Sequence, residues 1–306
     1  MNMKTIVSVA AACGCIAFAT AAEEPTEAEK GEFKVEDIVS VELGLNLDSR
    51  YMNYGVIDGK DPVLKPVGYL TLFDWVYVGG EMVFDVTKGN GKRAWGEGYG
   101  NRAGKYMLID ATAGLAHKFD LGESLGKLSV DFYYIYEYFQ RHSLGMYDTQ
   151  YLNLELSLED LWFEPKLWIE RDIMADNGTY VNLEVGHTIP LIGRTEESES
   201  EDDDEPVLAF RPSVGQGFGN TQRVRGYDFT NNGNALDHGG LMDTTIKGEL
   251  TWKVCDHLKL TAFLAYSDFW FDSNIRDGAR ERNASWGKGC DHSWNFYGGV
   301  GVKVEF

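Results

Sequence analysis

The side chains that could bind a metal are few and scattered along the chain. His238 follows Asp237, and His292 follows Cys290 and Asp291. Histidine, cysteine and aspartate are ligands of Zn²⁺, so convergence of these two segments would create a metal site. Single polar groups in wet loops are more often only solvated. We therefore expect no metal and no cofactor.

A set of catalytic groups is equally hard to assemble. An enzyme needs a nucleophile and a base, or metal ligands, in one place. The alternation of apolar residues puts His117 and His187 on an outer face and His257 in a turn, so these three do not converge. The local strings of outer-membrane phospholipases and lipid A hydrolases are not visible. We predict that the protein is not an enzyme, and a rim lipid hydrolase is the least favoured alternative.

Carboxylates are densest at 196–205, which reads EESESEDDDE. Clustered carboxylates suit Ca²⁺, but this run has neither the spacing nor the glycine of an EF-hand. Such a charge density prevents a packed core. We expect a flexible, solvated turn over 191–206, with calcium binding as the alternative.

The whole-chain composition limits the class of protein and of partner. The 306 residues carry a net charge of −20, which argues against nucleic acid and favours small cations over anions as guests. The 35 glycines, 13% aromatic residues and only 7 prolines suit long strands joined by tight turns.

The N-terminal residues have the order of an export signal. Lys4 precedes an apolar run over 6–18, which ends in the small residues of 19–22. We predict a signal peptide at 1–22, a short acidic periplasmic leader at 23–37 and one domain at 38–306.

From residue 38 onward, apolar residues alternate with polar or small ones in runs of about ten, as in transmembrane barrel strands. The clearest run ends the sequence, where every second residue from Trp294 to Phe306 is apolar or glycine. The outward face of the second run is ambiguous. The runs lie at 39–47, 66–73, 76–86, 107–119, 128–138, 152–158, 163–169, 181–185, 207–218, 242–254, 258–268 and 293–306.

These runs predict an all-β fold, a single antiparallel transmembrane β-barrel of about twelve strands. Long connections alternate with short ones, as external loops alternate with periplasmic turns in such barrels. Cys255 falls in a short turn and Cys290 in the last long loop. Their separation predicts two free thiols, Cys290 accessible from outside and Cys255 from the periplasm. Aromatic residues at the strand ends, among them Tyr151 and Tyr180, predict belts at the two membrane interfaces.

The segment 44–55, with Asp61-Pro62-Val63 and Val76-Tyr77-Val78-Gly79, resembles the start of an uncharacterised family of porin-like Gram-negative outer-membrane barrels. The last strand, ending at Phe306, is similar to the C-terminal signal that the barrel-assembly machinery reads. The resemblance implies residence in the bacterial outer membrane, in contact with its lipid and lipopolysaccharide. It assigns no residue a role.

Alternate residues of each strand face the inside of the barrel, and we say that they have the inward parity. Their side chains are the candidates for function, because polar groups there line a pore or fill it. The inward acids outnumber the inward bases, which predicts a passive channel or binding protein for small hydrophilic solutes, cationic or neutral. The alternative is a structural or surface-interaction barrel whose lumen is plugged by ion pairs. The candidate pore-lining residues are Glu42, Glu81, Asp85, Asp110, Asp131, Glu137, Glu155, Glu170, Arg211 and Lys247.

Overall fold

The computed structural model describes residues 38–88, 102–122, 124–139, 148–193, 206–231, 233–287 and 289–306. The expected signal peptide at 1–22, the leader at 23–37 and the acidic run at 196–205 lie outside these residues. The strands of the wall are β1 (Val39–Asp48), β4 (Val63–Leu72), β5 (Val76–Asp85), β6 (Tyr106–Asp120), β7 (Lys127–Phe139), β8 (Thr149–Leu158), β9 (Lys166–Asp172), β10 (Thr179–Gly186), β11 (Ile189–Ile192), β12 (Leu208–Gly219), β15 (Gly240–Cys255), β16 (Leu258–Asp268) and β17 (Asn295–Glu305). The connections carry β2 (Tyr51–Asn53), β3 (Val56–Gly59), α2 (Thr221–Gly226), β13 (Thr230–Asn231), β14 (Asn234–Ala235) and α3 (Ser273–Ala284).

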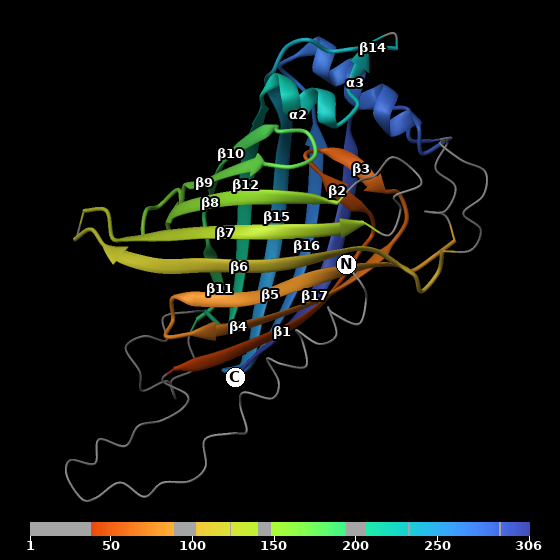
Figure 1. Ribbon diagram of the computed structural model, residues 1–306. Helices are drawn as coiled ribbons and strands as arrows, with labels where there is room; N and C mark the ends of the chain where they lie inside the picture. The colour runs from red at the N-terminus through yellow and green to blue at the C-terminus, as the bar shows by residue number, and fades with distance from the viewer. Residues whose placement is uncertain are drawn as a thin grey trace, which may run out of the picture. The chain divides into compact units, whose positions relative to one another are not determined.

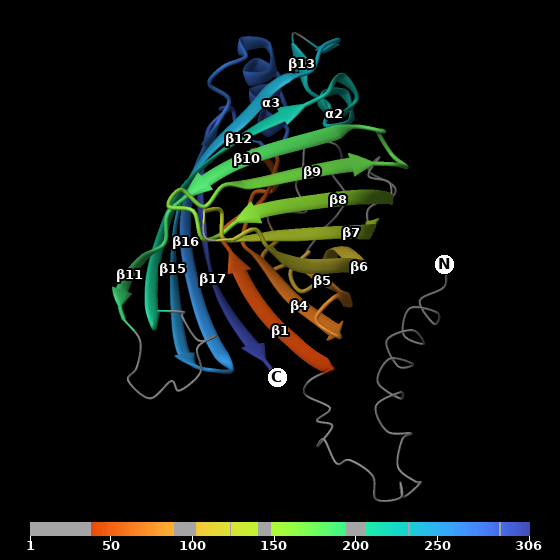
Figure 2. The same cartoon turned by 90° about the vertical axis from the view of Figure 1, so that its left-hand side faces the viewer.

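The wall is a closed antiparallel barrel (Figures 1 and 2). Each strand pairs with its neighbour in sequence, β17 returns to β1, and β10 pairs with β12. β10 and β11 both pair with β12 and together form one wall strand, so the barrel has twelve. Closure leaves no open sheet edge. The predicted fold and strand number are therefore confirmed.

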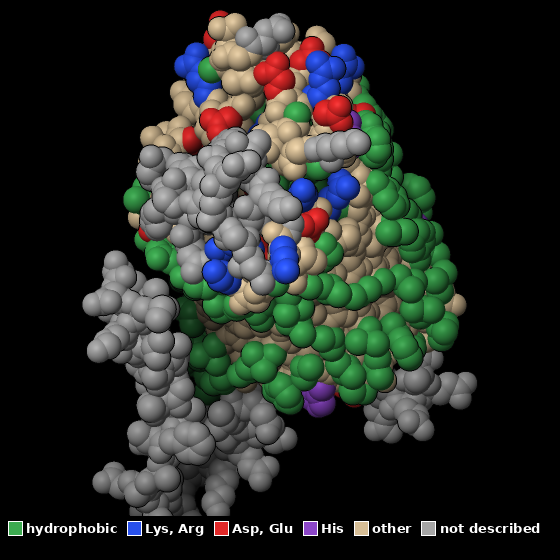
Figure 3. Space-filling view, turned by 90° about the vertical axis from the view of Figure 1, so that its right-hand side faces the viewer, with side chains coloured by type: hydrophobic (Ala, Val, Ile, Leu, Met, Phe, Trp, Pro, Cys, Tyr) green, Lys and Arg blue, Asp and Glu red, His purple; other side chains and the backbone are tan. Residues whose placement is uncertain are grey.

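The outer face of the barrel is apolar. Leu45, Leu115, Leu183 and Val300 are exposed on it, and Figure 3 shows hydrophobic side chains around the wall, with charged ones gathered at the end that carries the helices. This distribution is typical of a transmembrane barrel. Neither described helix is long and apolar enough to cross a bilayer.

Strand pairing resolves the second run, because directly opposed residues share a face. Leu70 of β4 pairs with Val41, which lies on the outward parity of β1. Leu70 therefore faces outward, and Lys65 and Tyr69 face the lumen. The seventh run begins later than predicted, at Lys166, because Glu164 has a φ of +36° and ends the preceding turn.

The long connections fold over one end of the barrel, which we call the long-loop end; the other is the short-turn end (Figure 1). The segments 49–62, 220–239 and 269–294 form what we call the mouth plug. Its core is apolar and packs on side chains of the inner wall. The core residues are Tyr54, Val56, Tyr180, Val224, Phe229, Leu236, Met242, Phe269, Ile275 and Ala279.

The prediction that Tyr151 and Tyr180 belong to an interfacial belt is wrong. They are 7% and 2% exposed. Their hydroxyls donate to Glu137 and Asp243 inside the barrel. A strand-end aromatic residue meets the bilayer only if its parity is outward, and these two have the inward parity.

Candidate functional site: the lumen and its plug

The candidate pore-lining residues occupy two parts of the inner wall. At the short-turn half, acids and bases form ion pairs with partly exposed side chains. Glu42 pairs with Lys303 at 2.7 Å, and Lys247 with Glu249 at 2.7 Å. Glu155 pairs with Lys166. Arg211 lies 2.8 Å from Glu164 and 2.6 Å from Glu184.

Glu81, Asp110 and Glu137 form a second group, which we call the acidic row. They are direct cross-strand partners on β5, β6 and β7. Side chains so opposed lie about 5 Å apart, and like charges at that spacing repel. Lys65 approaches Glu81 to 3.6 Å and Asp48 to 3.0 Å.

The other two acids of the row lack a base. Among the described residues, neither Asp110 nor Glu137 forms an ion pair, and the Oδ1 atom of Asp110 is buried without a hydrogen-bond partner. Glu137 accepts a hydrogen bond from the Tyr151 hydroxyl at 3.0 Å. Asp131, on the same wall, accepts one from Tyr77 at 2.8 Å. The acid excess of the lumen is therefore concentrated on this side.

Asp85 and Glu170 do not face open lumen, and Glu137 of the acidic row is itself only 5% exposed. Asp85 is fully buried, and its Oδ2 atom lies 3.0 Å from the Arg102 Nε atom. Glu170 is 4% exposed and lies under the mouth plug. Both have the expected inward parity, but contacts made by the connections cover them. The alternation of strand faces alone does not show whether a loop covers an inward-facing side chain.

The hairpin formed by β2 and β3 is the part of the plug that contacts the inner wall through its tip. Its two turn residues, Tyr54 and Gly55, have φ values of +45° and +80°. Two successive residues with positive φ suit a tight hairpin, but a tyrosine there is uncommon and must be held by packing. Tyr54 stacks on Trp168, with centroids 6.2 Å apart, and its hydroxyl donates to Glu170. Burial raises the pKa of Tyr54 well above its usual value, so the hydroxyl keeps its proton.

Arg223 of α2 meets the same carboxylate. The Asn220 side chain accepts the backbone N–H groups of Arg223 and Thr179, each at 3.0 Å, and so attaches the start of α2 to β10. The Arg223 guanidinium is fully buried, 3.1 Å from Glu170, and lies over the ring of Tyr54 at 5.0 Å. A buried arginine is retained at low cost only where such partners surround it.

The third plug segment binds the far side of the hairpin. The Asn283 side chain of α3 accepts the Ile57 N–H at 3.0 Å, and the Trp286 indole donates to the Ile57 carbonyl at 2.6 Å. Arg282 pairs with Asp58 at 2.5 Å. Cys290 packs beside Ile57 and Trp286. The hairpin is therefore bonded along its outer edge as well as at its tip.

Two polar cavities remain on the inner wall. The larger, of about 510 Å³, is bordered by Trp168, Asn182, Arg211 and Lys247, among others. The smaller, of about 440 Å³, is bordered by Tyr69, Tyr77, Asp131 and Tyr133, among others. Glu155 borders both. The lumen is thus hollow and polar in this region and packed at the long-loop end.

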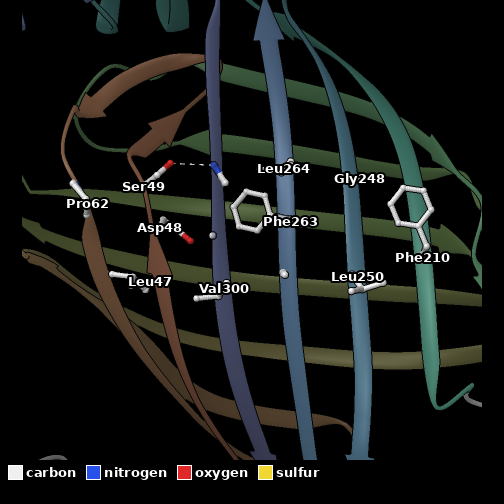
Figure 4. A pocket seen from close by; sticks show the side chains of 13 residues that line it. Leu47, Asp48, Ser49, Pro62, Phe210, Gly248, Leu250, Phe263, Leu264 and Val300 are labelled. Atoms are coloured by element: carbon white, nitrogen blue, oxygen red, sulfur yellow. Dashed lines mark hydrogen bonds between the residues drawn. The ribbon is translucent and has the colours of Figure 1, made fainter. Parts of the chain in front are cut away.

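A surface hollow of about 950 Å³ forms a groove on the outer face across β12, β15, β16, β17 and β1 (Figure 4). Its lining includes the outward side chains of Phe210, Leu250, Leu264 and Val300, and the glycine at 248 deepens it. The groove is apolar and faces away from the lumen. It is therefore not a place for a hydrophilic solute.

The histidine and cysteine residues do not form a site. His238 lies 3.4 Å from Asp272, whereas the His292 ring bonds backbone oxygens, Gly289 O at 3.1 Å among them. No group of three or more His, Cys, Asp or Glu residues in the described ranges could hold a metal ion. Cys255 and Cys290, the two cysteines among the described residues, are free, as predicted. Cys290, expected to be accessible, is only 6% exposed.

Sequence reasoning missed the plug residues Arg223, Arg282, Tyr54 and Trp168. The first three lie in connections, where no alternation marks an inward side. Trp168 lies in β9 beside Glu170 in the inward series, so parity could have identified it. The role of Phe306 as an assembly signal remains a prediction; its ring is exposed, and its backbone N–H and C=O each bond Val41 at 2.9 Å.

No family model matches the chain, and neither does any curated protein. Among solved structures it resembles the KdgM porin, with 7% identity over 87% of this chain and 99% of that one and a TM-score of 0.43. It also resembles an outer membrane channel from Pseudomonas putida F1, with 11% identity, 92% and 100% coverage and a TM-score of 0.45. A third is the outer membrane protein OprD from Pseudomonas aeruginosa, with 9% identity, 88% and 65% coverage and a TM-score of 0.38. The three are named as a porin, an outer membrane channel and an outer membrane protein.

Proposed function

We propose that this barrel is a passive channel of the bacterial outer membrane for small hydrophilic solutes, with cations preferred over anions. The acidic row carries the proposal. Two of its three carboxylates lack an ionic partner among the described residues, so a cation that enters the lumen meets carboxyl groups that no base already holds. Rings of carboxylates bind entering cations in this way in cation channels.

The apolar outer face supports the location, with lipid and lipopolysaccharide as neighbours and the barrel-assembly machinery as the partner that inserts the chain. In barrels of this class the long loops are external and the short turns periplasmic. The mouth plug is then external. The polar cavities reach toward the periplasm, since the larger is bordered by Leu158 and Glu159 at the β8 turn.

The packed plug makes the described conformation a closed one, and passage requires the plug to move. The plug is held to the wall by apolar packing and by polar contacts, among them the Arg223 and Glu170 pair. Loops of this kind open locally at a lower free energy than the barrel itself unfolds. A low open fraction is therefore expected.

The test is single-channel recording in planar bilayers, with reversal potentials measured in a KCl gradient. We expect rare openings with a preference for K⁺ over Cl⁻. The double variant Asp110→Asn/Glu137→Gln should lower that preference and leave the heat stability nearly unchanged, because neither carboxylate has an ionic partner among the described residues. An unaltered preference would contradict the proposal.

The packing of the plug favours a second candidate, a structural or surface-interaction barrel. Arg223, Phe229 and Trp286 are all fully buried, as in a permanent core. This candidate predicts no openings from the wild type or from any variant that loosens the plug. Recordings from Arg223→Met therefore distinguish the two functions.

A further inference from the structure

The larger cavity has the size and the lining of a ligand site. Its volume of about 510 Å³ falls within the range of roughly 300–1,000 Å³ that is usual for small-molecule sites. It is formed on the inner wall by β8, β9, β10, β12 and β15. Unlike the outer groove, it is lined mostly by polar side chains.

Five acids and three bases border this cavity, and each of them already has a charged partner, that of Glu159 being Lys118. Lys166 pairs with Glu155, Lys247 with Glu249, and Arg211 with both Glu164 and Glu184. An incoming ion would have to compete with a partner that is already in place. A neutral solute need not, because carboxylates have spare lone pairs and ammonium groups have spare N–H bonds.

Trp168 supplies the apolar part of the lining. Its indole N–H donates to the Asn153 side chain at 2.9 Å, which fixes the ring. The ring borders the cavity and also packs against the core of the mouth plug. The Asn182 amide, beside it across the β9–β10 pair, borders the same space.

A fixed aromatic ring next to balanced donors and acceptors matches one class of solute. Sugars and other polyols present C–H groups that pack on an aromatic face and hydroxyl groups that both donate and accept. We propose that the cavity bordered by Trp168, Asn182, Arg211 and Lys247 binds a neutral polyhydroxylated solute, a saccharide. This proposal rests on the proposed function, since it names a solute class for the same lumen.

Isothermal titration of the folded full chain tests the proposal. The detergent must have no sugar headgroup, and the probes are sucrose and maltotriose, with glucosamine as the cationic and galacturonate as the anionic comparison. We expect saturable binding of a neutral saccharide and weaker binding of both charged probes. No saturable heat from either neutral saccharide, or tighter binding of a charged probe, would overturn it.

Variants locate the site. Trp168→Ala should weaken binding about tenfold, the size expected for the loss of one aromatic contact, and Trp168→Phe should restore most of it. Trp162→Ala is the matched control, because Trp162 is 75% exposed and does not border the cavity. Equal affinities of Trp168→Ala and Trp162→Ala would place the site elsewhere and reject the proposal.

Trp168 also packs on the plug, so a second variant keeps the test independent of plug stability. Ser157→Leu fills the cavity from β8 and should abolish binding while the heat-modifiable gel shift of the barrel persists; undiminished binding would contradict the proposal. Titration requires no current. If the barrel binds saccharide but never conducts, only the channel proposal is rejected. If it conducts but does not bind saccharide, only the saccharide proposal is rejected.

Discussion

The Arg223 Nη2 atom lies 3.1 Å from the Glu170 Oε1 atom, and this ion pair joins the helix of a long connection to the inner wall of the barrel. Both side chains are almost wholly buried. Tyr54, from a different loop, donates to the same carboxylate oxygen. One carboxylate of β9 therefore holds two of the three plug segments, which makes it the point at which the closed state is most sensitive to substitution.

Arg223→Met should loosen the plug. It leaves Glu170 buried without its ionic partner, which costs about 3–5 kcal/mol when one member of a buried pair is removed. We expect a higher open fraction in single-channel records, with the barrel still resistant to unfolding in unheated gel samples. The double variant Arg223→Met/Glu170→Gln removes the Glu170 charge, leaves that of Asp176, which lies 3.4 Å from Arg223 in the wild type, and should return the open fraction part of the way to the wild-type value. Arg276→Met, at an exposed position on α3, is the control and should change neither.

Asp85 and Asp110 should respond differently to the same substitution. Asp85→Asn leaves Arg102 without its carboxylate in a buried site, so we expect a loss of about 3–5 kcal/mol. Asp110→Asn removes a carboxyl group that has no ionic partner among the described residues and lies beside two other acids, so stability should hold or rise. Urea titrations of both variants measure the difference. Equal losses would mean that Asp110 has a partner after all.

Cys290 should report on the plug. Because it is buried beside Ile57 and Trp286, an impermeant maleimide added to whole cells should label it slowly. Arg282→Met removes the pair with Asp58 and should speed the labelling several-fold. Cys255, which is exposed at the short-turn end, should react only after the outer membrane is permeabilised. Prompt labelling of Cys255 in intact cells would reverse the proposed orientation.

Gly55→Ala should prevent the hairpin from seating. Gly55 has a φ of +80°, and an added Cβ would lie 2.3 Å from the Asp243 Cβ atom and 3.0 Å from the ring of Phe269. Gly104→Ala is the matched control, since Gly104 has a φ of +76° but no atom within 4 Å of an added Cβ. Only Gly55→Ala should raise the labelling rate of Cys290. A rise in both variants would assign the effect to backbone strain instead of the collision.

The predictions from sequence succeeded wherever one local rule governed the outcome. A β-strand places alternate residues on opposite faces, so the order of residues in β17 or β6 is enough to separate outward from inward side chains. The rule did not assign the faces of the second run, because its glycine, proline and tyrosine residues make the two faces similar in polarity. It also gave no account of Arg223 or Arg282, because connections have no period.

The sequence by itself determined the strands, the faces and the barrel, because these depend on contacts between residues two apart and between neighbouring strands. Only the tertiary structure decided which carboxylates of the lumen are paired and which are left alone. The two side chains that hydrogen-bond to Glu170 lie 53 and 116 positions from it in the sequence, and the arginine that pairs with Asp58 lies 224 positions away. Such partners are fixed by strand register and by how loops fold back over a closed wall. A local sequence pattern predicts neither the strand register nor the path of the loops. Together they decide whether an inward-facing acid lines an open lumen or holds the plug.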